Sequence, residues 1–358
     1  MEKLIVRNFG PLKDINIELK SFNLLIGEQS SGKSSIAKLL TILNDKNFLL
    51  LVSTSENTDS LYREFSNYKI KTYFKSDTYI EYQNKARETI TYKEGHFACN
   101  PSHQTLGMSM EPMDVEMAKA YAHTIWKSSL YIPAERNFSS TFSRALSSMV
   151  LNKIPIPTFL LEFMSIFDQA KNEYDTFDIP ELQLNFQAGE REMISLNGAQ
   201  TPYDESSSGI QSVLPMMMTL RYASKVLAYK RFIIEEPESN LFPENQVKIL
   251  QTFVSILNED LKNRNMIITT HSPYLLTALN NMLQAGRLLK SAPEKADKIG
   301  QIIPIPCCLS TDYVTAYYLN NGTAKNIIDE EFGIISADDL DNISNIVSEQ
   351  FDQLINLE

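Results

Sequence analysis

The sequence predicts an α/β fold with a mixed sheet, and three kinds of pattern support this prediction. Apolar runs typical of buried strands occur at residues 22–26, 232–234 and 266–268. Segments at 35–43 and 213–227 read as apolar helices. Residues 61–98 alternate polar positions with aromatic or β-branched ones, which is typical of an antiparallel meander. Strands that alternate with helices indicate an α/β lobe, to which the meander adds antiparallel strands.

The first apolar strand runs into the loop Gly27-Glu-Gln-Ser-Ser-Gly-Lys-Ser34, which fits the pattern G-x-x-x-x-G-K-S. Its two glycines let the backbone turn tightly, so that consecutive N–H groups point toward bound phosphates. Lys33 supplies a positive charge, and the Ser34 hydroxyl is a ligand for Mg²⁺. A chance glycine loop would not also have the preceding strand and the following helix. We predict that ATP or GTP, with Mg²⁺, is bound by Gly27, Glu28, Gln29, Ser30, Ser31, Gly32, Lys33, Ser34 and Ser35.

Two adjacent carboxylates end the strand at 232–234. We predict that Glu235 holds Mg²⁺ and that Glu236 polarises the attacking water as general base. The alternative is an exposed acidic turn after a strand. The phosphate loop favours the catalytic interpretation.

A histidine ends the next apolar run, at 265–270. His271 is predicted to hydrogen-bond the γ-phosphate of the nucleotide. A lone histidine is more often a structural residue, but its position after the carboxylate pair, with Ser272 and Pro273 following, favours the catalytic role.

A serine-rich cluster, Ser206-Ser-Ser-Gly-Ile-Gln211, precedes the apolar helix at 213–227. Such clusters are usually loops, but a helix N-terminus is also a ready phosphate site. The phosphates of a nucleotide bound to this chain would already be held by the loop that carries Lys33. We therefore predict that Ser208 and Gly209 contact the phosphate of a partner subunit, which requires a homodimer or a higher homo-oligomer.

In this order the four motifs resemble those of ABC-type ATPases of the SMC/Rad50 and OLD-like branch, the AAA15/AAA21 group. The opening segment 4–17, Tyr131-Ile-Pro-Ala-Glu-Arg136 and Asn240-Leu-Phe-Pro243 are similar to that branch as well. The resemblance covers residues 1–44, 131–136 and 206–280. It implies an ABC-ATPase head that hydrolyses ATP, with Glu236 and His271 as catalytic residues. The chain departs from the family at Ile210, where a glycine is usual, and at Phe242, where histidine is frequent. Glu135 or Arg136 occupies the place of the family's switch glutamine.

Four regions follow from the motifs and from the segments between them. Residues 1–136 form an N-terminal ATPase lobe with the phosphate loop and an antiparallel β-subdomain, and residues 201–306 form a C-terminal ATPase lobe with the other three motifs. Between them, 137–200 is predicted to be a short helical lobe, because no sustained heptad pattern supports the coiled coil of SMC proteins. Residues 307–358 are predicted to be an acidic C-terminal extension.

Composition favours a cytoplasmic enzyme that does not contact a membrane. The chain has 358 residues and a net charge of −11. Its apolar runs all fall short of the about 18 residues that span a membrane, and Met1 leads directly into a predicted strand without a signal peptide. The three cysteines, two of them adjacent, do not form a disulfide framework.

The resemblance also suggests a biological role. Many relatives act in bacterial anti-phage defence, so we expect an ATP-dependent sensor that regulates a separately encoded effector, a toxin or nuclease, in response to a phage-derived trigger. The acidic end is then either a docking surface for a basic partner or a solvated helix face. The alternative function is a DNA-repair or recombination ATPase that clamps DNA. The net charge weakens that alternative, although a basic face could still contact phosphates. That face would comprise Lys13, Lys20, Lys69, Lys71 and Lys75.

Overall fold

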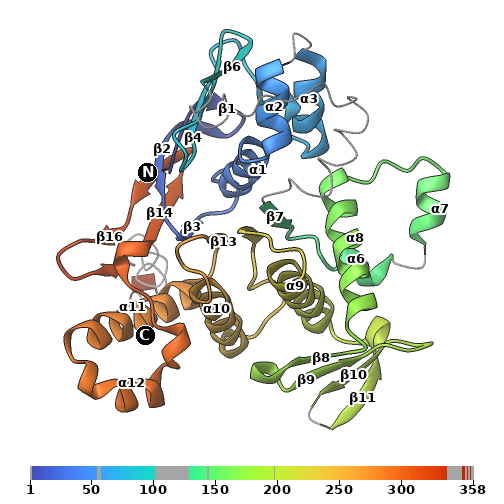
Figure 1. Ribbon diagram of the computed structural model, residues 1–358, viewed down its shortest axis with the longest axis vertical. Helices are drawn as coiled ribbons and strands as arrows, with labels where there is room; N and C mark the ends of the chain where they lie inside the picture. The colour runs from blue at the N-terminus through green and yellow to red at the C-terminus, as the bar shows by residue number, and fades with distance from the viewer. Residues whose placement is uncertain are drawn as a thin grey trace, which may run out of the picture.

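The computed structural model describes residues 2–54, 58–100, 129–142, 145–196 and 198–336, together with residues 349, 350, 353 and 355. A sheet of 11 strands, in the order β6-β5-β4-β1-β2-β15-β14-β3-β13-β12-β7, organises the molecule (Figure 1). Its strands are β1 Glu2–Phe9, β2 Leu12–Leu19, β3 Phe22–Gly27, β4 Tyr79–Gln83, β5 Thr89–Lys93, β6 His96–Asn100, β7 Ser129–Ile132, β12 Arg231–Glu235, β13 Asn265–Thr270, β14 Val314–Asn320 and β15 Thr323–Asn326.

One end of this sheet is antiparallel and the other is parallel. Strands β6, β5, β4, β1 and β2 pair antiparallel, whereas β14, β3, β13, β12 and β7 pair parallel. Every residue of β3, β12 and β13 is buried, as expected for strands covered on both faces. The predicted α/β class with a mixed sheet is confirmed.

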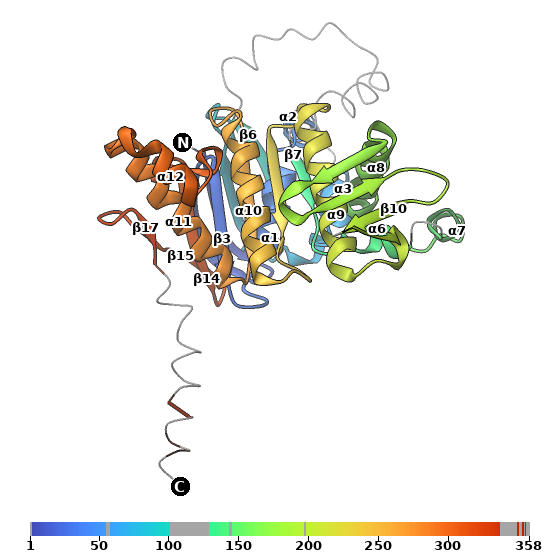
Figure 2. The same cartoon turned by 90° about the horizontal axis from the view of Figure 1, so that it is seen from below.

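Helices cover both faces of the parallel strands. Figure 1 shows α1, α2 and α3 on one side and α9, α10 and α11 on the other, and Figure 2 shows the same layers from below. These helices are α1 Lys33–Leu43, α2 Lys46–Thr54, α3 Thr58–Asn67, α9 Ser208–Lys225, α10 Pro243–Asn258 and α11 Pro273–Ser291, and the shorter α12 Ala296–Ile302 follows α11. Single 3-10 turns lie between the larger elements: η1 Lys71–Tyr73, η3 Tyr203–Glu205, η4 Pro293–Lys295, η5 Ile305–Cys307 and η6 Thr311–Tyr313.

The predicted antiparallel meander at 61–98 is partly wrong. Its later strands are present as β4, β5 and β6, but its first part continues helix α3 and then forms the turn η1. Helix α3 buries Leu61 and Phe65 at helical spacing, and this core contact overrides the strand propensity of the aromatic residues.

The region predicted as a helical lobe is half helix and half sheet. Helices α6 Phe138–Thr141, α7 Leu146–Leu151 and α8 Thr158–Glu173 come first, and α8 packs against α9. A four-stranded antiparallel sheet follows, with strands β8 Thr176–Ile179, β9 Leu184–Gln187, β10 Met193–Leu196 and β11 Ala199–Pro202. The 3-10 turn η2 Pro180–Leu182 connects β8 to β9. Alternate residues of β8 and β9 are buried, so period-two patterning explains the strands that the helical prediction missed.

The predicted boundary at 307 places two strands of the large sheet, β14 and β15, in the C-terminal extension. Strand β14 lies beside β3, and six of its seven residues are buried. This apolar run is buried on both faces, so it belongs to the sheet. A short hairpin, β16 Ile328–Asp329 and β17 Ile334–Ile335, follows it. The predicted acidic, apolar-striped end from Asp329 to Glu358 begins in this hairpin and not in a helix, and from residue 337 on it lies outside the described residues except for residues 349, 350, 353 and 355.

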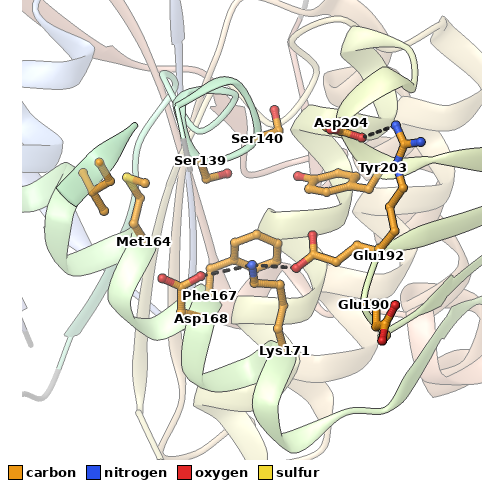
Figure 3. Close-up of a pocket in the computed structure, with 13 residues that line it drawn as sticks. Ser139, Ser140, Met164, Phe167, Asp168, Lys171, Glu190, Glu192, Tyr203 and Asp204 are labelled. Atoms are coloured by element: carbon orange, nitrogen blue, oxygen red, sulfur yellow. Dashed lines mark hydrogen bonds and ion pairs between the residues drawn. The ribbon is translucent and has the colours of Figure 1, made fainter. Parts of the chain in front are cut away.

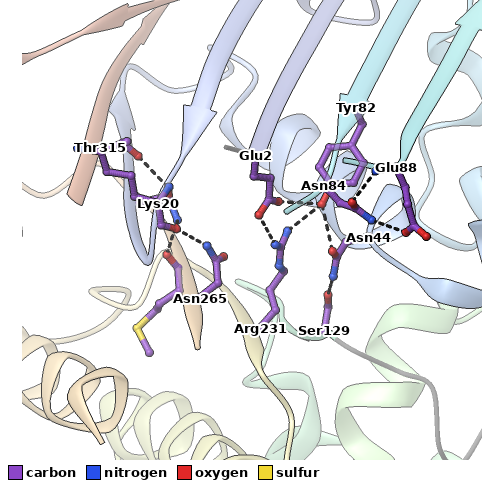
Figure 4. Close-up of polar contacts among 12 residues, drawn as sticks. Glu2, Lys20, Asn44, Tyr82, Asn84, Glu88, Ser129, Arg231, Asn265 and Thr315 are labelled. Atoms are coloured by element: carbon purple, nitrogen blue, oxygen red, sulfur yellow. Dashed lines mark hydrogen bonds and ion pairs between the residues drawn. The ribbon is translucent and has the colours of Figure 1, made fainter. Parts of the chain in front are cut away.

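A buried ion pair joins the start of β1 to the start of β12 (Figure 4). The Arg231 guanidinium lies 2.6 Å from the Glu2 carboxylate, and both side chains are less than 10% exposed. The Tyr82 hydroxyl donates to Glu2 and contacts Asn44, whose amide donates to Ser129. Removing one partner would leave an unpaired buried charge, which costs about 3–5 kcal/mol.

Candidate nucleotide site

The phosphate loop connects β3 to α1, and both of its glycines are required by close contacts. A Cβ atom on Gly27 would lie 2.1 Å from the Leu319 carbonyl oxygen of β14. Gly32 has a φ of +102°, and its Cβ would lie 2.3 Å from a methyl carbon of Leu12. The loop is therefore fitted to the neighbouring strands through residues that lack a side chain.

A pocket of about 480 Å³ opens above this loop. Its lining brings together most of the predicted site, including Glu236 and His271, with three residues that the sequence did not single out. Those three are Gly10, Pro11 and Tyr73, and the others are Gln29, Ser30, Ser31, Gly32, Lys33, Ser34 and Ser35. The Gly10 N–H donates to the Tyr73 carbonyl, 2.9 Å away, which joins the β1–β2 turn to η1. The Gly-Pro turn was the available signal for this wall.

The Lys33 side chain curls into the loop. Its Nζ donates to the carbonyl oxygens of Gly27 and Glu28, at 2.9 and 2.6 Å, and to the Ser31 hydroxyl at 3.3 Å. Burial lowers the pKa of Lys33 to about 8, against the raising effect of nearby glutamates. A bound phosphate would favour the charged ammonium and raise that pKa again.

The Glu235 carboxylate is buried, with 3% exposure. Burial raises its pKa to about 7, although Lys38 and the hydroxyls of Tyr131 and Ser34 lower it. Its Oε1 has no hydrogen-bond partner among the residues that the structure describes. An unpaired carboxylate oxygen beside a serine hydroxyl is a donor set that suits Mg²⁺, so the residues fit the predicted metal.

Glu236 differs from Glu235 in exposure and in backbone conformation. Its side chain is 35% exposed and faces the pocket, where its Oε1 lies 3.5 Å from Nε2 of His271. Its φ of +42° lies in the left-handed region, which is unusual for a residue with a side chain. The two adjacent carboxylates thus occupy different environments, one in the core and one at the pocket.

The loops after β12 and β13 are joined by a third glutamate. Glu238 Oε1 accepts hydrogen bonds from the His271 N–H and the Thr270 hydroxyl, both at 2.7 Å. Glu238 lies two residues after Glu236, and the sequence alone indicated no role for it.

The serine cluster lies at the N-terminus of α9, away from this pocket. Ser208 is exposed, and a Cβ on Gly209 would lie 2.7 Å from the Asn240 carbonyl oxygen. Neither residue lines the pocket that contains Lys33. The Gln211 side chain instead folds back, donating to the Asp204 and Ser206 carbonyls and accepting from the Ser140 hydroxyl.

Neither candidate for the switch glutamine lines the pocket. Glu135 is exposed to solvent, and Arg136 is fully buried behind the carboxylate pair.

A second pocket of about 320 Å³ lies in the lobe formed by α6–α8 and β8–β11 (Figure 3). Lys171 crosses it, 3.1 Å from Asp168 and 2.9 Å from Glu192, over the ring of Phe167. Acidic side chains outnumber basic ones in its lining, so it does not suit a phosphate.

Neither a cluster of metal ligands nor a membrane-spanning helix is present in the described part of the chain. It contains no group of three or more His, Cys, Asp or Glu side chains that could hold a metal ion, and the three cysteines are free thiols. Within the same ranges, no helix combines the length and apolar character needed to cross a membrane.

A family model described as the AAA ATPase domain (AAA_15) matches residues 1–143 and 116–276, which together extend over more than three quarters of the chain. Among curated proteins, none matches the sequence significantly.

Several solved structures align with most of the chain. The SMC head domain from Thermotoga maritima aligns at 13% identity over 91% of this chain and 97% of its own, with a TM-score of 0.42. An SMC head domain with an extended coiled coil, bound to the C-terminal domain of ScpA from Pyrococcus furiosus, is 11% identical over 91% of this chain and 96% of its own, with a TM-score of 0.41. The ADP conformation of an ATP-binding cassette of an ABC transporter is 14% identical over 91% of this chain and 90% of its own, with a TM-score of 0.35.

Proposed function

The chain belongs to the AAA ATPase domain family (AAA_15) and is an ATPase, and we propose that it hydrolyses ATP at composite sites formed between two subunits. In this proposal the phosphate loop of one subunit and the serine cluster of another enclose each ATP. Two subunits arranged head to tail would then sandwich two nucleotides.

The observation that carries this proposal is the separation of the predicted phosphate-binding groups. Lys33, Glu236 and His271 share one pocket, whereas Ser208 and Gly209 stand outside it at the exposed N-terminus of α9. The N-terminus of this 18-residue helix carries partial positive charge and N–H donors. Because the phosphates of this subunit would lie against its own loop, an exposed phosphate-binding helix end indicates a second subunit.

Within each site we assign one role to each group. Lys33 and the loop N–H groups bind the β- and γ-phosphates. Ser34 and Glu235 would hold Mg²⁺, which would offset the negative charge of the phosphates. Glu236 would orient the attacking water and accept its proton, and His271 would contact the γ-phosphate.

We further propose that this ATPase is a sensor that regulates a separately encoded effector, a toxin or nuclease, in bacterial anti-phage defence, with a phage-derived trigger. The lobe formed by α6–α8 and β8–β11 supports this role, because it adds a second pocket and an exposed surface not used by the nucleotide site. Leu151 is 82% exposed and Val150 is 54% exposed on α7, as on surfaces that bind other proteins.

The alternative, a repair or recombination ATPase that clamps DNA, has less support from the surface. Lys13 lies near the start of β2, where its N–H donates to the Gly322 carbonyl. Lys20 lies just after the other end of β2, where its amine donates to the Thr311 carbonyl. Lys13 and Lys20 therefore lie toward opposite ends of β2 and are not neighbours on one basic face.

Two experiments test the proposal. The Glu236→Gln variant should bind ATP·Mg²⁺, stall before hydrolysis and accumulate as a dimer or larger species in light scattering, whereas Lys33→Ala should remain unchanged by ATP. An ATP-bound monomer of Glu236→Gln would contradict the composite site. Co-purification with products of adjacent genes tests the sensor role, and tight DNA binding with no protein partner would favour the repair function.

A further inference from the structure

One buried arginine contacts the backbone that carries both candidate catalytic carboxylates. Arg136 follows β7 and has 0% exposure, and it is the largest fully buried side chain in the described structure. It lies in the segment 131–136, whose role the sequence left open.

The guanidinium binds the carbonyl oxygens of two consecutive residues. Nη1 donates to Glu235 O at 2.8 Å and to Pro133 O at 3.2 Å, and Nη2 donates to Glu236 O at 2.7 Å. The pairing of β12 with β7 ends at Ile234, opposite Ile132. Arg136 therefore continues the support of β12 at the point where its neighbouring strand stops.

This support lies at a strained point of the chain. A left-handed conformation is unfavourable for a residue with a side chain, and Glu236 adopts it with φ of +42°. The Glu236 N–H donates to the Thr269 carbonyl, 2.9 Å away, and its carbonyl accepts from Arg136. The peptide groups on both sides of the Glu236 side chain are thus held from two directions.

The same arginine begins the lobe. The Arg136 carbonyl accepts a hydrogen bond from the Ser139 hydroxyl at 2.7 Å. The next residue, Ser140, donates to the Gln211 side chain at 3.0 Å, near the start of α9. A short segment, 136–140, therefore connects the Glu236 backbone to both the lobe and the helix that carries the serine cluster.

We propose that Arg136 is a positioning residue for ATP hydrolysis, which fixes the Glu235–Glu236 backbone so that the Glu236 carboxylate faces the nucleotide pocket. Through it, the position of the lobe sets the orientation of that carboxylate. This inference rests on the proposed role of Glu236 as general base. Arg136 does not contact the nucleotide pocket, so its effect is expected on the chemical step and not on ATP binding.

The test compares Arg136→Ala with a matched control, Arg264→Ala. Arg264 is also buried, at 7% exposure, and its guanidinium also binds backbone carbonyls, those of Ile256 and Ser224. It precedes β13, at the end of that strand opposite His271. Both variants should lose thermal stability, but only Arg136→Ala should lose kcat, by about 100-fold, with its Kd for ATP within about threefold of wild type.

A double-mutant cycle separates positioning from general loosening of the fold. If Arg136 acts through Glu236, adding Arg136→Ala to Glu236→Gln should leave the residual kcat unchanged, whereas independent effects would multiply. Arg136→Lys, which keeps the charge but lacks the planar fork, should lower kcat by a smaller factor with ATP binding intact.

Each outcome bears on the inference. An equal kcat in Arg136→Ala and Arg264→Ala, or multiplied effects in the double variant, would overturn it. If neither Arg136 variant yields folded protein that binds ATP, Arg136 is a folding residue and the inference is wrong. A Glu236→Gln variant that hydrolyses ATP at the wild-type rate would instead refute the proposed base, on which the inference depends.

Discussion

Glu238 holds the backbone of His271 through a hydrogen bond of 2.7 Å from the His271 N–H to its Oε1. The same oxygen accepts from the Thr270 hydroxyl, so one carboxylate fixes the end of β13 relative to the loop after β12. Across the same two loops, Nε2 of His271 lies 3.5 Å from Oε1 of Glu236. Two loops that each carry one proposed catalytic residue are thereby joined by a third residue between them.

Replacing this carboxylate should loosen the His271 loop. Glu238→Ala leaves two donors without their partner, which should lower the free energy of unfolding by about 2 kcal/mol. It should also lower kcat by about tenfold, because the two catalytic side chains are no longer held together. Urea unfolding and steady-state kinetics check both effects. Glu244→Ala, which removes an exposed glutamate on α10, should change neither, and a wild-type kcat in Glu238→Ala would contradict the positioning role.

Nucleotide binding and subunit pairing should separate in a second pair of variants. Lys33→Ala removes the cation that lies inside the phosphate loop, so it should abolish detectable ATP binding. Ser208→Arg adds bulk at the exposed end of α9, outside the pocket, so it should keep ATP affinity and lose hydrolysis together with ATP-dependent dimerisation. Equilibrium binding, ATPase rates and light scattering check these outcomes. Equal loss of ATP binding in both variants would show that the serine cluster belongs to the same subunit's site.

The motif residues could be predicted from sequence because each motif is local. The phosphate loop, its flanking strand and its helix are contiguous, and the geometry around Lys33 follows from that short segment. The pair Glu235 and Glu236 likewise lies at the end of one apolar strand. Short-range patterns of this kind fix the local backbone, and the backbone then places the side chains.

Long-range contacts could not be predicted in the same way. Arg136 meets Glu235 across 99 positions of the chain, and no local pattern indicates that pairing. Strand β14 lies beside β3 although nearly the whole chain separates them, so its apolar run was mistaken for part of an extension. Strand order depends on tertiary packing, which a pattern within one segment does not contain.

Stability should depend on pH through Glu235. Its pKa of about 7 in the folded protein is raised above the usual value of 4.5, so the unfolded chain releases this proton at lower pH. The free energy of unfolding of nucleotide-free protein should therefore fall as pH rises from about 4.5 to 7, by up to about 3 kcal/mol from this group.

Glu235→Gln isolates this contribution. The difference in the free energy of unfolding, wild type minus variant, should decrease with pH across that interval and level off above it. Urea unfolding without Mg²⁺ or nucleotide measures it. A difference that is constant with pH would show that the Glu235 carboxyl titrates normally. The variant should also show weakened Mg²⁺ dependence of ATP binding if this carboxylate holds the metal.

The final prediction concerns where the chain can be shortened when the acidic end is tested as a dock for a basic effector. Ile335 is 1% exposed, and its backbone exchanges two hydrogen bonds with the Asn280 side chain, at 2.7 and 2.8 Å. A chain that ends at Ser336 should keep this contact, with wild-type stability and ATPase activity. A chain that ends at Lys325 also loses the buried Ile327 and should unfold at a lower temperature.

The same truncation tests the docking surface. If the acidic residues after 336 dock a basic effector, ending the chain at Ser336 should be enough to abolish co-purification, and added salt should weaken the full-length complex. A Ser336 truncation that still binds the effector fully, while hydrolysing ATP, would place the contact on the lobe formed by α6–α8 and β8–β11 instead.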